Sequence, residues 1–121
     1  MAKLIFILED NEDLRELYRL ILEDEKYEIL SFATLAEFRR HSTEIPDLYL
    51  LDVMLPDGDG IELCRELKAN AASADVPVIM VSAHKQLAEV KTECPEADFV
   101  AKPFDIDYLT QKIAQQIRER L

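Results

Sequence analysis

Apolar residues along this chain gather into five short runs, separated by longer segments with helical spacing. The runs are Leu4–Leu8, Tyr27–Phe32, Leu48–Leu51, Val78–Val81 and Phe99–Ala101. The third and fourth are rich in valine, isoleucine and leucine without polar alternation, which is typical of strands covered on both faces. Strands that alternate with helices build βαβ units. The pattern therefore predicts an α/β fold around a parallel five-stranded sheet, with the short fifth run at its edge.

The segments between the runs carry helix signals. Asn11 can cap a helix that begins near Glu12, and Thr34 with Glu37 forms a capping box for a short second helix. The first helix should bury an apolar stripe of Leu14, Leu17, Tyr18, Ile21 and Leu22. Further helices are expected after Gly60, from Leu87 until Pro95, and from about Ile106 to the end of the chain.

The net charge of the chain limits the classes of partner that it is expected to bind. A length of 121 residues suits one domain, and the formal net charge is −11. Nucleic-acid phosphates are bound by basic surfaces, so no direct nucleic-acid contact is expected. An acidic surface suits a basic partner protein, although solubility alone also explains it. The N-terminal apolar run is too short for a signal peptide, and no stretch reaches the roughly 18 apolar residues of a membrane span. We therefore expect a cytoplasmic protein without membrane contact.

The two cysteines belong to no metal-binding or redox motif. Cys64 and Cys94 lie at apolar positions of their helices and form no C-x-x-C or Cys/His cluster. In a reducing cytosol, buried free thiols are expected here rather than a disulfide or a metal site.

Four of the five runs end in polar residues suited to phosphate chemistry. Glu9 and Asp10 follow the first run, Asp52 the third, Ser82 the fourth and Lys102 the fifth. Ligands of open α/β sheets bind at the carboxyl ends of the strands. If the runs are parallel strands of one sheet, these distant residues meet in one site.

The three acids of this set suggest a metal and a nucleophile. Glu9 and Asp10 offer the oxygen ligands that Mg²⁺ prefers, and together with Asp52 they would repel one another without a cation. Taken alone, Glu9-Asp10 would more commonly cap the next helix, and Asp52 would more commonly cap the loop that follows it. The carboxylate of Asp52 is also able to attack phosphorus and form an aspartyl phosphate.

The remaining polar ends suit a phosphoryl group. The Ser82 hydroxyl can donate to a phosphoryl oxygen, although a serine in this place commonly bonds its own backbone. Lys102 can neutralise part of the acid cluster and hold a phosphoryl group, or it is a surface lysine before a turn. A cis peptide at Lys102-Pro103 is one explanation of that pair. If Ser82 moved toward a phosphoryl group, Phe99 could turn into the vacated space; otherwise Phe99 is a static strand aromatic.

With these residues in view, the chain resembles a receiver domain of the two-component response regulators. The resemblance covers essentially residues 1–121 as one receiver domain. It rests on Glu9-Asp10, Asp52, the Met54…Pro56…Gly60 loop, Ser82-Ala83 and Lys102-Pro103-Phe104. It implies a doubly wound, flavodoxin-like (βα)5 fold with strand order 2-1-3-4-5. It also implies Mg²⁺-dependent transfer of a phosphoryl group from a histidine kinase or phosphotransfer protein.

The resemblance also assigns roles to residues. Asp52 would be the phosphoacceptor, and Asp10, the Met54 carbonyl and Glu9, directly or through a water, would hold Mg²⁺ with it. Ser82 and Lys102 would bind the phosphoryl group, and Ser82 with Phe99 would form the switch. Met54 and His84, each two residues after a site residue, should flank the path of attacking water and tune the lifetime of the phosphate.

The chain departs from the family pattern at three places. Glu9 stands where aspartate is commoner, Ser82 to Lys102 is about two residues shorter than usual, and Glu96-Ala97-Asp98 lacks a customary glycine. The last two lie on the face that family members often use for dimerisation or signalling. We expect output through a downstream protein partner or an effector domain outside this sequence, with a phosphorylation-dependent homodimer as a further option.

The expected function is thus a phosphoacceptor signalling domain, not an enzyme beyond its own phosphotransfer and autodephosphorylation. A haloacid-dehalogenase-like phosphatase would need a second aspartate where Met54 stands. A flavodoxin-like mononucleotide binder would need a neutral phosphate loop in place of the acids after the first run. A receiver-like interaction module that is never phosphorylated stays open because of Glu9.

Overall fold

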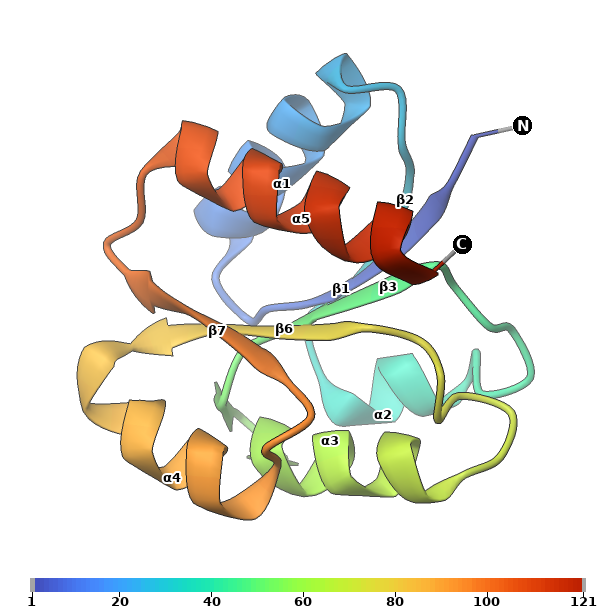
Figure 1. Ribbon diagram of the computed structural model, residues 1–121, viewed down its shortest axis with the longest axis vertical. Helices are drawn as coiled ribbons and strands as arrows, with labels where there is room; N and C mark the ends of the chain where they lie inside the picture. The colour runs from blue at the N-terminus through green and yellow to red at the C-terminus, as the bar shows by residue number, and fades with distance from the viewer. Residues whose placement is uncertain (1, 121) are drawn as a thin grey trace.

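A parallel five-stranded sheet forms the centre of the computed structural model, which describes residues 2–120 and the side chains of residues 2–118 (Figure 1). Its strands are β1 (Leu4–Leu8), β2 (Glu28–Phe32), β3 (Leu48–Leu51), β6 (Val78–Ala83) and β7 (Asp98–Lys102). They pair in the order β2-β1-β3-β6-β7, and every pair is parallel. Counted along this sheet alone, that is the expected order 2-1-3-4-5 with the last strand at an edge, so the predicted fold class is confirmed.

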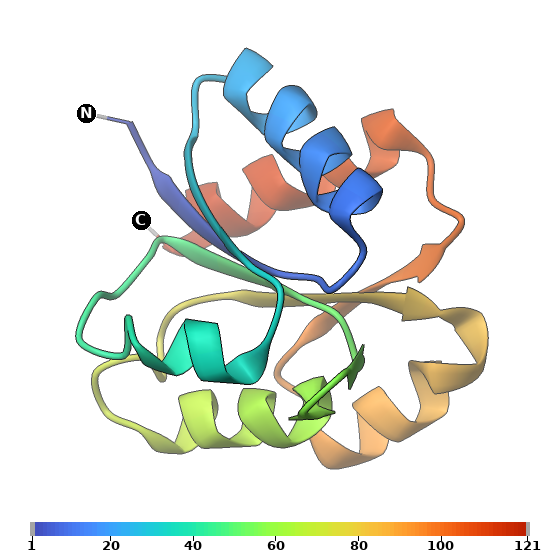
Figure 2. The same cartoon turned by 180° about the vertical axis from the view of Figure 1, so that it is seen from behind.

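The helices cover both faces of the sheet. Helices α1 (Glu12–Asp24) and α5 (Ile106–Arg120) lie on one face. Helices α2 (Leu35–Arg39), α3 (Gly60–Ala69) and α4 (Leu87–Glu93), the last preceded by the 3-10 turn η1 (His84–Gln86), lie on the other (Figure 2). Because successive strand residues point to opposite faces, Ile5 and Ile7 belong to the α1/α5 core, whereas Phe6 and Leu8 belong to the other.

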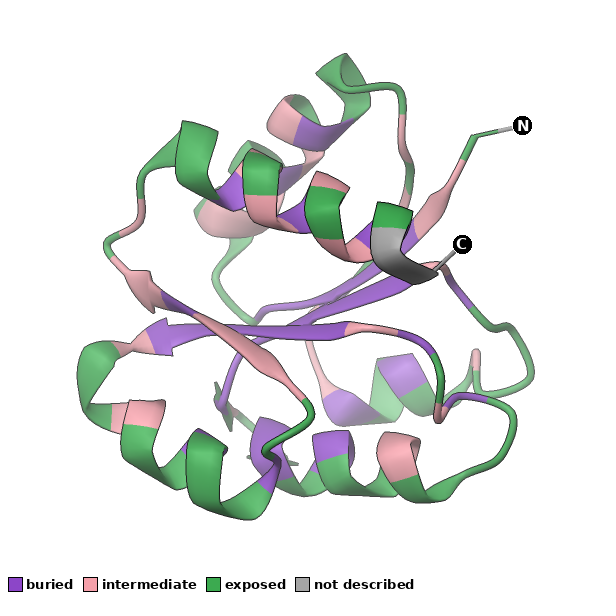
Figure 3. Ribbon diagram, viewed as in Figure 1, coloured by how far each residue is buried: buried purple, intermediate pink, exposed green. Residues whose placement is uncertain are grey.

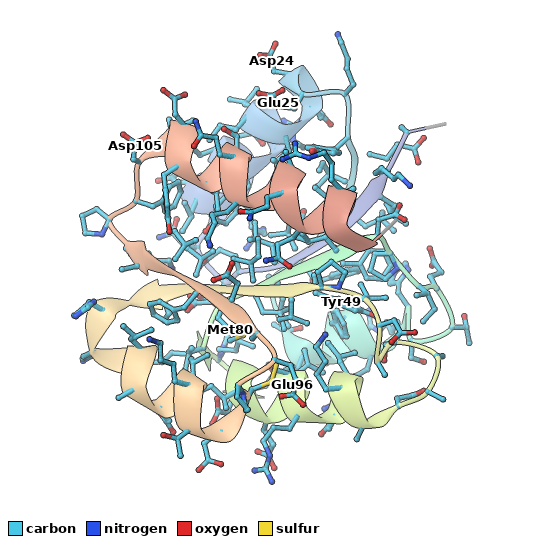
Figure 4. The ribbon with its side chains drawn as sticks, viewed as in Figure 1. Asp24, Glu25, Tyr49, Met80, Glu96 and Asp105 are labelled. Carbon is cyan, nitrogen blue, oxygen red and sulfur yellow. A yellow bond between two sulfur atoms is a disulfide. The ribbon has the colours of Figure 1, made fainter. Side chains whose placement is uncertain are left out.

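The interior strands are buried along nearly their whole length, while the outward helix faces are exposed (Figure 3). Tyr49 and Met80 show the arrangement on the α2/α3/α4 side, where both side chains join the core below the sheet (Figure 4). Of the first helix's expected stripe, Tyr18 and Leu22 are fully buried, whereas Leu17 is 37% exposed. Among the described residues no helix is long and apolar enough to cross a membrane.

The capping predictions are confirmed at atomic detail. The Asn11 side chain accepts a hydrogen bond from the Leu14 N–H at 2.9 Å. Thr34 accepts one from the Glu37 N–H at 3.1 Å, and the Glu37 carboxylate reaches back to the Ala33 N–H at 2.9 Å. The short helix α2 therefore begins at a fully bonded terminus.

The loop after β3 holds a feature that the sequence pattern did not reveal. Met54–Leu55 (β4) and Gly58–Asp59 (β5) pair as a small antiparallel hairpin apart from the main sheet. Its turn is fastened to α2, because the Asp57 carboxylate accepts the N–H groups of Leu35 and Ala36 at 2.9 and 3.0 Å. The first of these bonds is the main cause that lowers the pKa of Asp57. The β4–β5 turn and the start of α2, which are far apart in sequence, are thus held together.

The expectation of free thiols is wrong. Cys64 in α3 and Cys94 at the end of α4 form a disulfide, with their Cα atoms 6.5 Å apart. Both residues are buried in the core that α2, α3 and α4 share. The two cysteines are 30 residues apart in sequence, and only the side-by-side packing of α3 and α4 brings their sulfur atoms together.

Tyr18 carries a buried hydroxyl. Its ring stacks on Phe104 with centroids 5.8 Å apart, and among the described residues its oxygen finds no hydrogen-bond partner. Burial, with smaller contributions from the charges of Glu9 and Asp52, raises the pKa of this phenol.

We expect Tyr18→Phe to raise the free energy of unfolding by about 1 kcal/mol, because it removes a desolvated hydroxyl without removing packing. Urea unfolding measures the change. Tyr108→Phe is the control, since Tyr108 is 49% exposed and should be neutral. A destabilised Tyr18→Phe protein would show that the hydroxyl is bonded in solution.

Candidate functional site: an acidic cluster at the carboxyl edge of the sheet

The polar strand ends meet at one edge of the sheet, as the sequence predicted. Glu9 follows β1 and Asp52 follows β3, while Ser82 and Lys102 lie in the last residues of β6 and β7. The register aligns these ends, since Leu8 pairs with Leu51 and Ala83 pairs with Lys102. The backbone of Asp52 is fixed by its N–H bond to the Leu8 carbonyl at 3.0 Å. Four strands therefore position one compact set of side chains.

Asp52 lies at the centre of this set and accepts three hydrogen bonds. One carboxylate oxygen, Oδ1, accepts the Ser82 hydroxyl at 2.9 Å and the Val53 N–H at 2.7 Å. The other, Oδ2, accepts Lys102 Nζ at 3.0 Å. Both Asp52 and Ser82 are buried. The serine hydroxyl thus bonds the acid and not its own backbone.

Lys102 bridges two acids from different strands. Its Nζ also donates to Glu9 Oε1 at 2.9 Å, while Glu9 Oε2 accepts the Asn11 N–H at 3.1 Å. Only 27% of the lysine side chain is exposed, and only 3% of the glutamate side chain. The peptide bond between Lys102 and Pro103 is cis, the geometry raised as an option from the sequence.

Burial and neighbouring charges shift the pKa values of Glu9 and Lys102. Burial is the largest cause that raises the pKa of Glu9, with the Asp52 charge adding to it and the Lys102 hydrogen bond opposing it. Burial alone would lower the pKa of Lys102, but its hydrogen bonds to Glu9 and Asp52, with their charges, raise it overall. The site therefore favours the protonated form of Lys102, and the excess negative charge of its carboxylates is energetically unfavourable.

The three acids fit a divalent cation. Glu9, Asp10 and Asp52 each offer a carboxylate oxygen, and these atoms all lie within 4.8 Å of one another. Asp10 is exposed while the other two are buried, so the cluster opens to solvent on its side. Hard oxygen donors at this spacing suit Mg²⁺, which binds through one or two carboxylates and keeps several waters.

Three further residues with predicted roles lie outside the hydrogen-bonded set. Met54 is 65% exposed, and its sulfur lies 3.7 Å from the amide nitrogen of Gln86 in η1. Phe99 is half-buried in β7, and it lines a surface hollow of about 490 Å³ together with exposed His84. The roles of Met54, Phe99 and His84 stay predictions.

Sequence reasoning missed several contacts that shape the site. Arg15 donates to the Glu9 carbonyl at 2.8 Å, and the Asn11 N–H holds the Glu9 carboxylate besides the cap that Asn11 provides. The Arg15 contact had no signal in helical spacing, because the Glu9 carbonyl lies six residues before Arg15 and outside the helix. The approach of Gln86 to Met54 had no local signal, because it depends on the placement of η1 against the hairpin.

The fold and the site together define a doubly wound α/β protein with a strand-end acid cluster that includes a lysine and a hydroxyl. Residues 5–114 match the family described as response regulator receiver domain. The chain belongs to this family, which serves signal transduction in two-component systems.

Individual relatives agree with the family. The chain is 36% identical to the transcriptional regulatory protein CssR of Bacillus subtilis, over 97% of this chain and 53% of that protein. It is similar to a CheY-like response regulator receiver domain protein from Methanospirillum hungatei (TM-score 0.87, 28% identity, 99% and 97% of the two chains). It is also similar to the receiver domain of sensor histidine kinase PA1611 from Pseudomonas aeruginosa, a structure with magnesium in its active-site cleft (TM-score 0.82, 26% identity, 97% and 98%). The chain spans about half the length of the curated relatives it matches.

Proposed function

We propose that this domain accepts a phosphoryl group on Asp52 from a histidine kinase or phosphotransfer protein, and that it changes conformation in response. The observation that carries the proposal is the Asp52 carboxylate held between the Lys102 ammonium and the Ser82 hydroxyl, beside two further acids. The acids, the hydroxyl and the ammonium of this site come from the ends of four strands, β1, β3, β6 and β7. The only covalent role of the protein is that of the nucleophile, and the rest is positioning and charge stabilisation.

In the transfer step, a carboxylate oxygen of Asp52 attacks the phosphorus of a phosphohistidine. The new P–O bond forms as the P–N bond breaks, and the bonding electron pair returns to the imidazole nitrogen. Lys102 and Ser82, which donate to the Asp52 oxygens before the reaction, are placed to donate to the phosphoryl oxygens after it. The domain catalyses its own phosphotransfer and dephosphorylation and is proposed to have no other enzymatic activity.

Glu9, Asp10 and Asp52 would hold Mg²⁺, with the Met54 carbonyl as a further ligand. When bound, the ion supplies positive charge against the three carboxylates and the incoming phosphoryl oxygens. Lys102 contributes one positive charge of its own, so the acids and the lysine leave a net −2 that a divalent cation balances. The magnesium in the cleft of the similar PA1611 receiver domain supports this assignment.

Phosphorylation changes that balance and drives the switch. A phosphoryl group adds negative charge and acceptor oxygens at Asp52. The Ser82 hydroxyl, bonded to Asp52 Oδ1, then follows the new oxygens, and Phe99 turns into the space that Ser82 leaves. The output passes to a protein partner or to an effector domain in the same polypeptide, or through a homodimer, and the domain works in the cytoplasm. Similarity to the transcriptional regulatory protein CssR supports an output in gene regulation.

Intact mass after incubation with acetyl phosphate and Mg²⁺ tests the proposal. The wild-type chain should gain one phosphoryl group, and Asp52→Asn should gain none. Asp98→Asn is the control, because Asp98 is an acid paired with Lys112 outside the site, and it should still be phosphorylated. A wild type without gain, or an Asp52→Asn protein that gains as much, contradicts the proposal. Removing Mg²⁺ with a chelator should abolish the gain.

The exposed Met54 side chain gives a prediction about phosphate lifetime. We expect Met54→Asn to hydrolyse its phosphate roughly tenfold faster, since an amide beside Asp52 can hydrogen-bond the attacking water and one such bond is worth about 1.4 kcal/mol. Loss of the added mass after removal of acetyl phosphate measures the rate. Met54→Leu is the matched control and should behave as wild type. An unchanged rate in Met54→Asn would mean that water approaches from another side.

A further inference from the structure

The disulfide between Cys64 and Cys94 joins the two helices that follow the site's central residues. Helix α3 begins directly after the Asp52 loop, and α4 follows Ser82 through η1. An exposed ion pair between Arg65 and Glu93, 3.7 Å apart, lies beside the bond on the same two helices. The covalent bond is therefore the stronger of two links between α3 and α4.

These helices close a ring that includes the phosphoacceptor. On one side, the Gly60 N–H at the start of α3 donates to the Val53 carbonyl at 2.7 Å, which fixes α3 against the Asp52 loop. On the other, Ser82 donates to Asp52 at 2.9 Å. The path from Asp52 through α3, the disulfide, α4 and η1 back to Ser82 is thus covalent except for that one hydrogen bond.

We propose that thiol–disulfide exchange at Cys64–Cys94 controls how readily the domain takes up its phosphorylated conformation. This inference rests on the proposed function. Ser82 lies two residues before η1, and the seven-residue helix α4 follows η1 directly, so a movement of the Ser82 backbone toward the phosphoryl group would carry both with it. While the bond is intact, the far end of α4 is fixed to α3 and resists the shift. The oxidised domain is therefore biased toward the unphosphorylated conformation, and reduction releases it.

The exchange is balanced by a dithiol reductant. A thiolate of the dithiol attacks one sulfur, the Cys64–Cys94 bond breaks, and a mixed disulfide forms. The second thiol of the reductant then resolves the mixed disulfide. In total, two electrons and two protons pass from the dithiol to the protein, and the products are two cysteine thiols and the oxidised dithiol. Disulfides in reducing compartments are usually transient or redox-sensing, which favours a regulatory bond over a permanent one.

The burial of the sulfurs couples the two events in both directions. Cys64 and Cys94 are 0% and 1% exposed, so a reductant reaches them only when α4 moves away from the core. If phosphorylation favours that movement, the phosphorylated domain is reduced faster. If the same movement also makes reduction more favourable at equilibrium, linkage requires that the reduced domain is phosphorylated more favourably.

Two measurements on the whole chain test this coupling. Oxidised and dithiothreitol-reduced proteins are incubated with acetyl phosphate and Mg²⁺, and intact mass gives the ratio of phosphorylation to dephosphorylation rates. We expect this ratio to be at least about fivefold higher in the reduced protein, the lower end of usual coupling between sites. Separately, the phosphorylated wild type should be reduced at least about fivefold faster than Asp52→Asn, as followed by alkylation of the released thiols.

A Cys64→Ala/Cys94→Ala variant is the matched control. Its phosphorylation should match that of the reduced wild type and should not change when the reductant is added. A thermal melt checks that the variant is folded. If the variant unfolds, the oxidised protein is compared with the reduced wild type alone. Equal rate ratios in oxidised and reduced protein overturn the inference and leave the proposed function standing. Two thiols that stay free under a mild oxidant overturn it as well. No phosphoryl gain in either redox state overturns the proposed function, and the inference with it.

Discussion

Replacing Lys102 by alanine is expected to slow phosphorylation of Asp52 by about a hundredfold, the effect of removing one preorganised donor from a developing oxyanion. Lys102 is the ammonium that donates to both Glu9 and Asp52. Without it, two buried carboxylates face each other, and the phosphoryl oxygens lose their charged donor. The initial rate of mass gain with acetyl phosphate at saturating Mg²⁺ measures the change.

Lys112→Ala is the control for this experiment. Lys112 is a partly buried lysine whose Nζ lies 2.8 Å from Asp98, outside the acidic cluster, so its loss should leave the phosphorylation rate unchanged. Lys102→Arg keeps the charge but not the compact point donor, so its rate should fall between wild type and alanine. If Lys102→Ala were phosphorylated at the wild-type rate, Lys102 would have no role in the transfer step.

The same lysine predicts a pH dependence of stability. The folded-state pKa of Lys102 is raised, so its contribution to stability is complete below the unfolded value of about 10.4 and is lost as pH rises through the folded value. The stability difference between wild type and Lys102→Ala should therefore be constant from neutral pH to about pH 10 and shrink above it. Urea unfolding across this range measures it, and a difference that already shrinks at neutral pH would contradict the assignment.

Gly60→Ala should destabilise the fold by about 3 kcal/mol, near the upper end of ordinary overpacking costs. A Cβ on Gly60 would lie 1.8 Å from the Asp52 carbonyl oxygen and 3.2 Å from the Val53 Cα. The Asp52 backbone cannot yield easily, because its N–H is bonded to β1 through Leu8. Alanine normally favours a helix over glycine by about 1 kcal/mol, so a loss here isolates the backbone clash.

Gly58→Ala provides the comparison within the same loop. Its Cβ would meet Leu35 Cδ1 at 2.3 Å, and that atom is the end of a flexible side chain. We expect Gly58→Ala to cost less than about 1 kcal/mol, since one rotamer change relieves the contact. Urea unfolding of both variants decides the matter. Equal stability of Gly60→Ala and wild type would mean that the loop moves away from β3 without penalty.

The regular elements were largely readable before the structure. Leu48–Leu51 is β3 as predicted, and the helices begin at or near the positions that Asn11, Thr34 and Gly60 indicated. These features depend on local chemistry, namely capping side chains and apolar spacing, which neighbouring residues decide among themselves. The membership of Glu9, Asp52 and Lys102 in one site also followed from their places at strand ends, once a parallel sheet was assumed.

Other features needed the three-dimensional packing. The bonds from Asp57 in the β4–β5 turn to α2 depend on how α2 packs beside that hairpin, and the contact of Gln86 with Met54 depends on how η1 meets it. The pairing of Cys64 with Cys94 depends on α3 lying against α4. Asp57 and α2, Met54 and Gln86, and Cys64 and Cys94 are each more than 20 residues apart, so no periodicity or spacing pointed to these contacts.

The amino-acid sequence by itself determined the order of strands and helices, the helix starts and the kinds of side chain at each strand end. Only the tertiary structure decided which of those side chains bond one another: Lys102 to both Glu9 and Asp52, Ser82 to Asp52, and Cys64 to Cys94. The physical reason is range. Capping and periodicity act within about one helical turn, whereas a hydrogen bond or a disulfide requires particular atoms to lie within a few ångströms, and that distance is set by how the helices pack on the sheet.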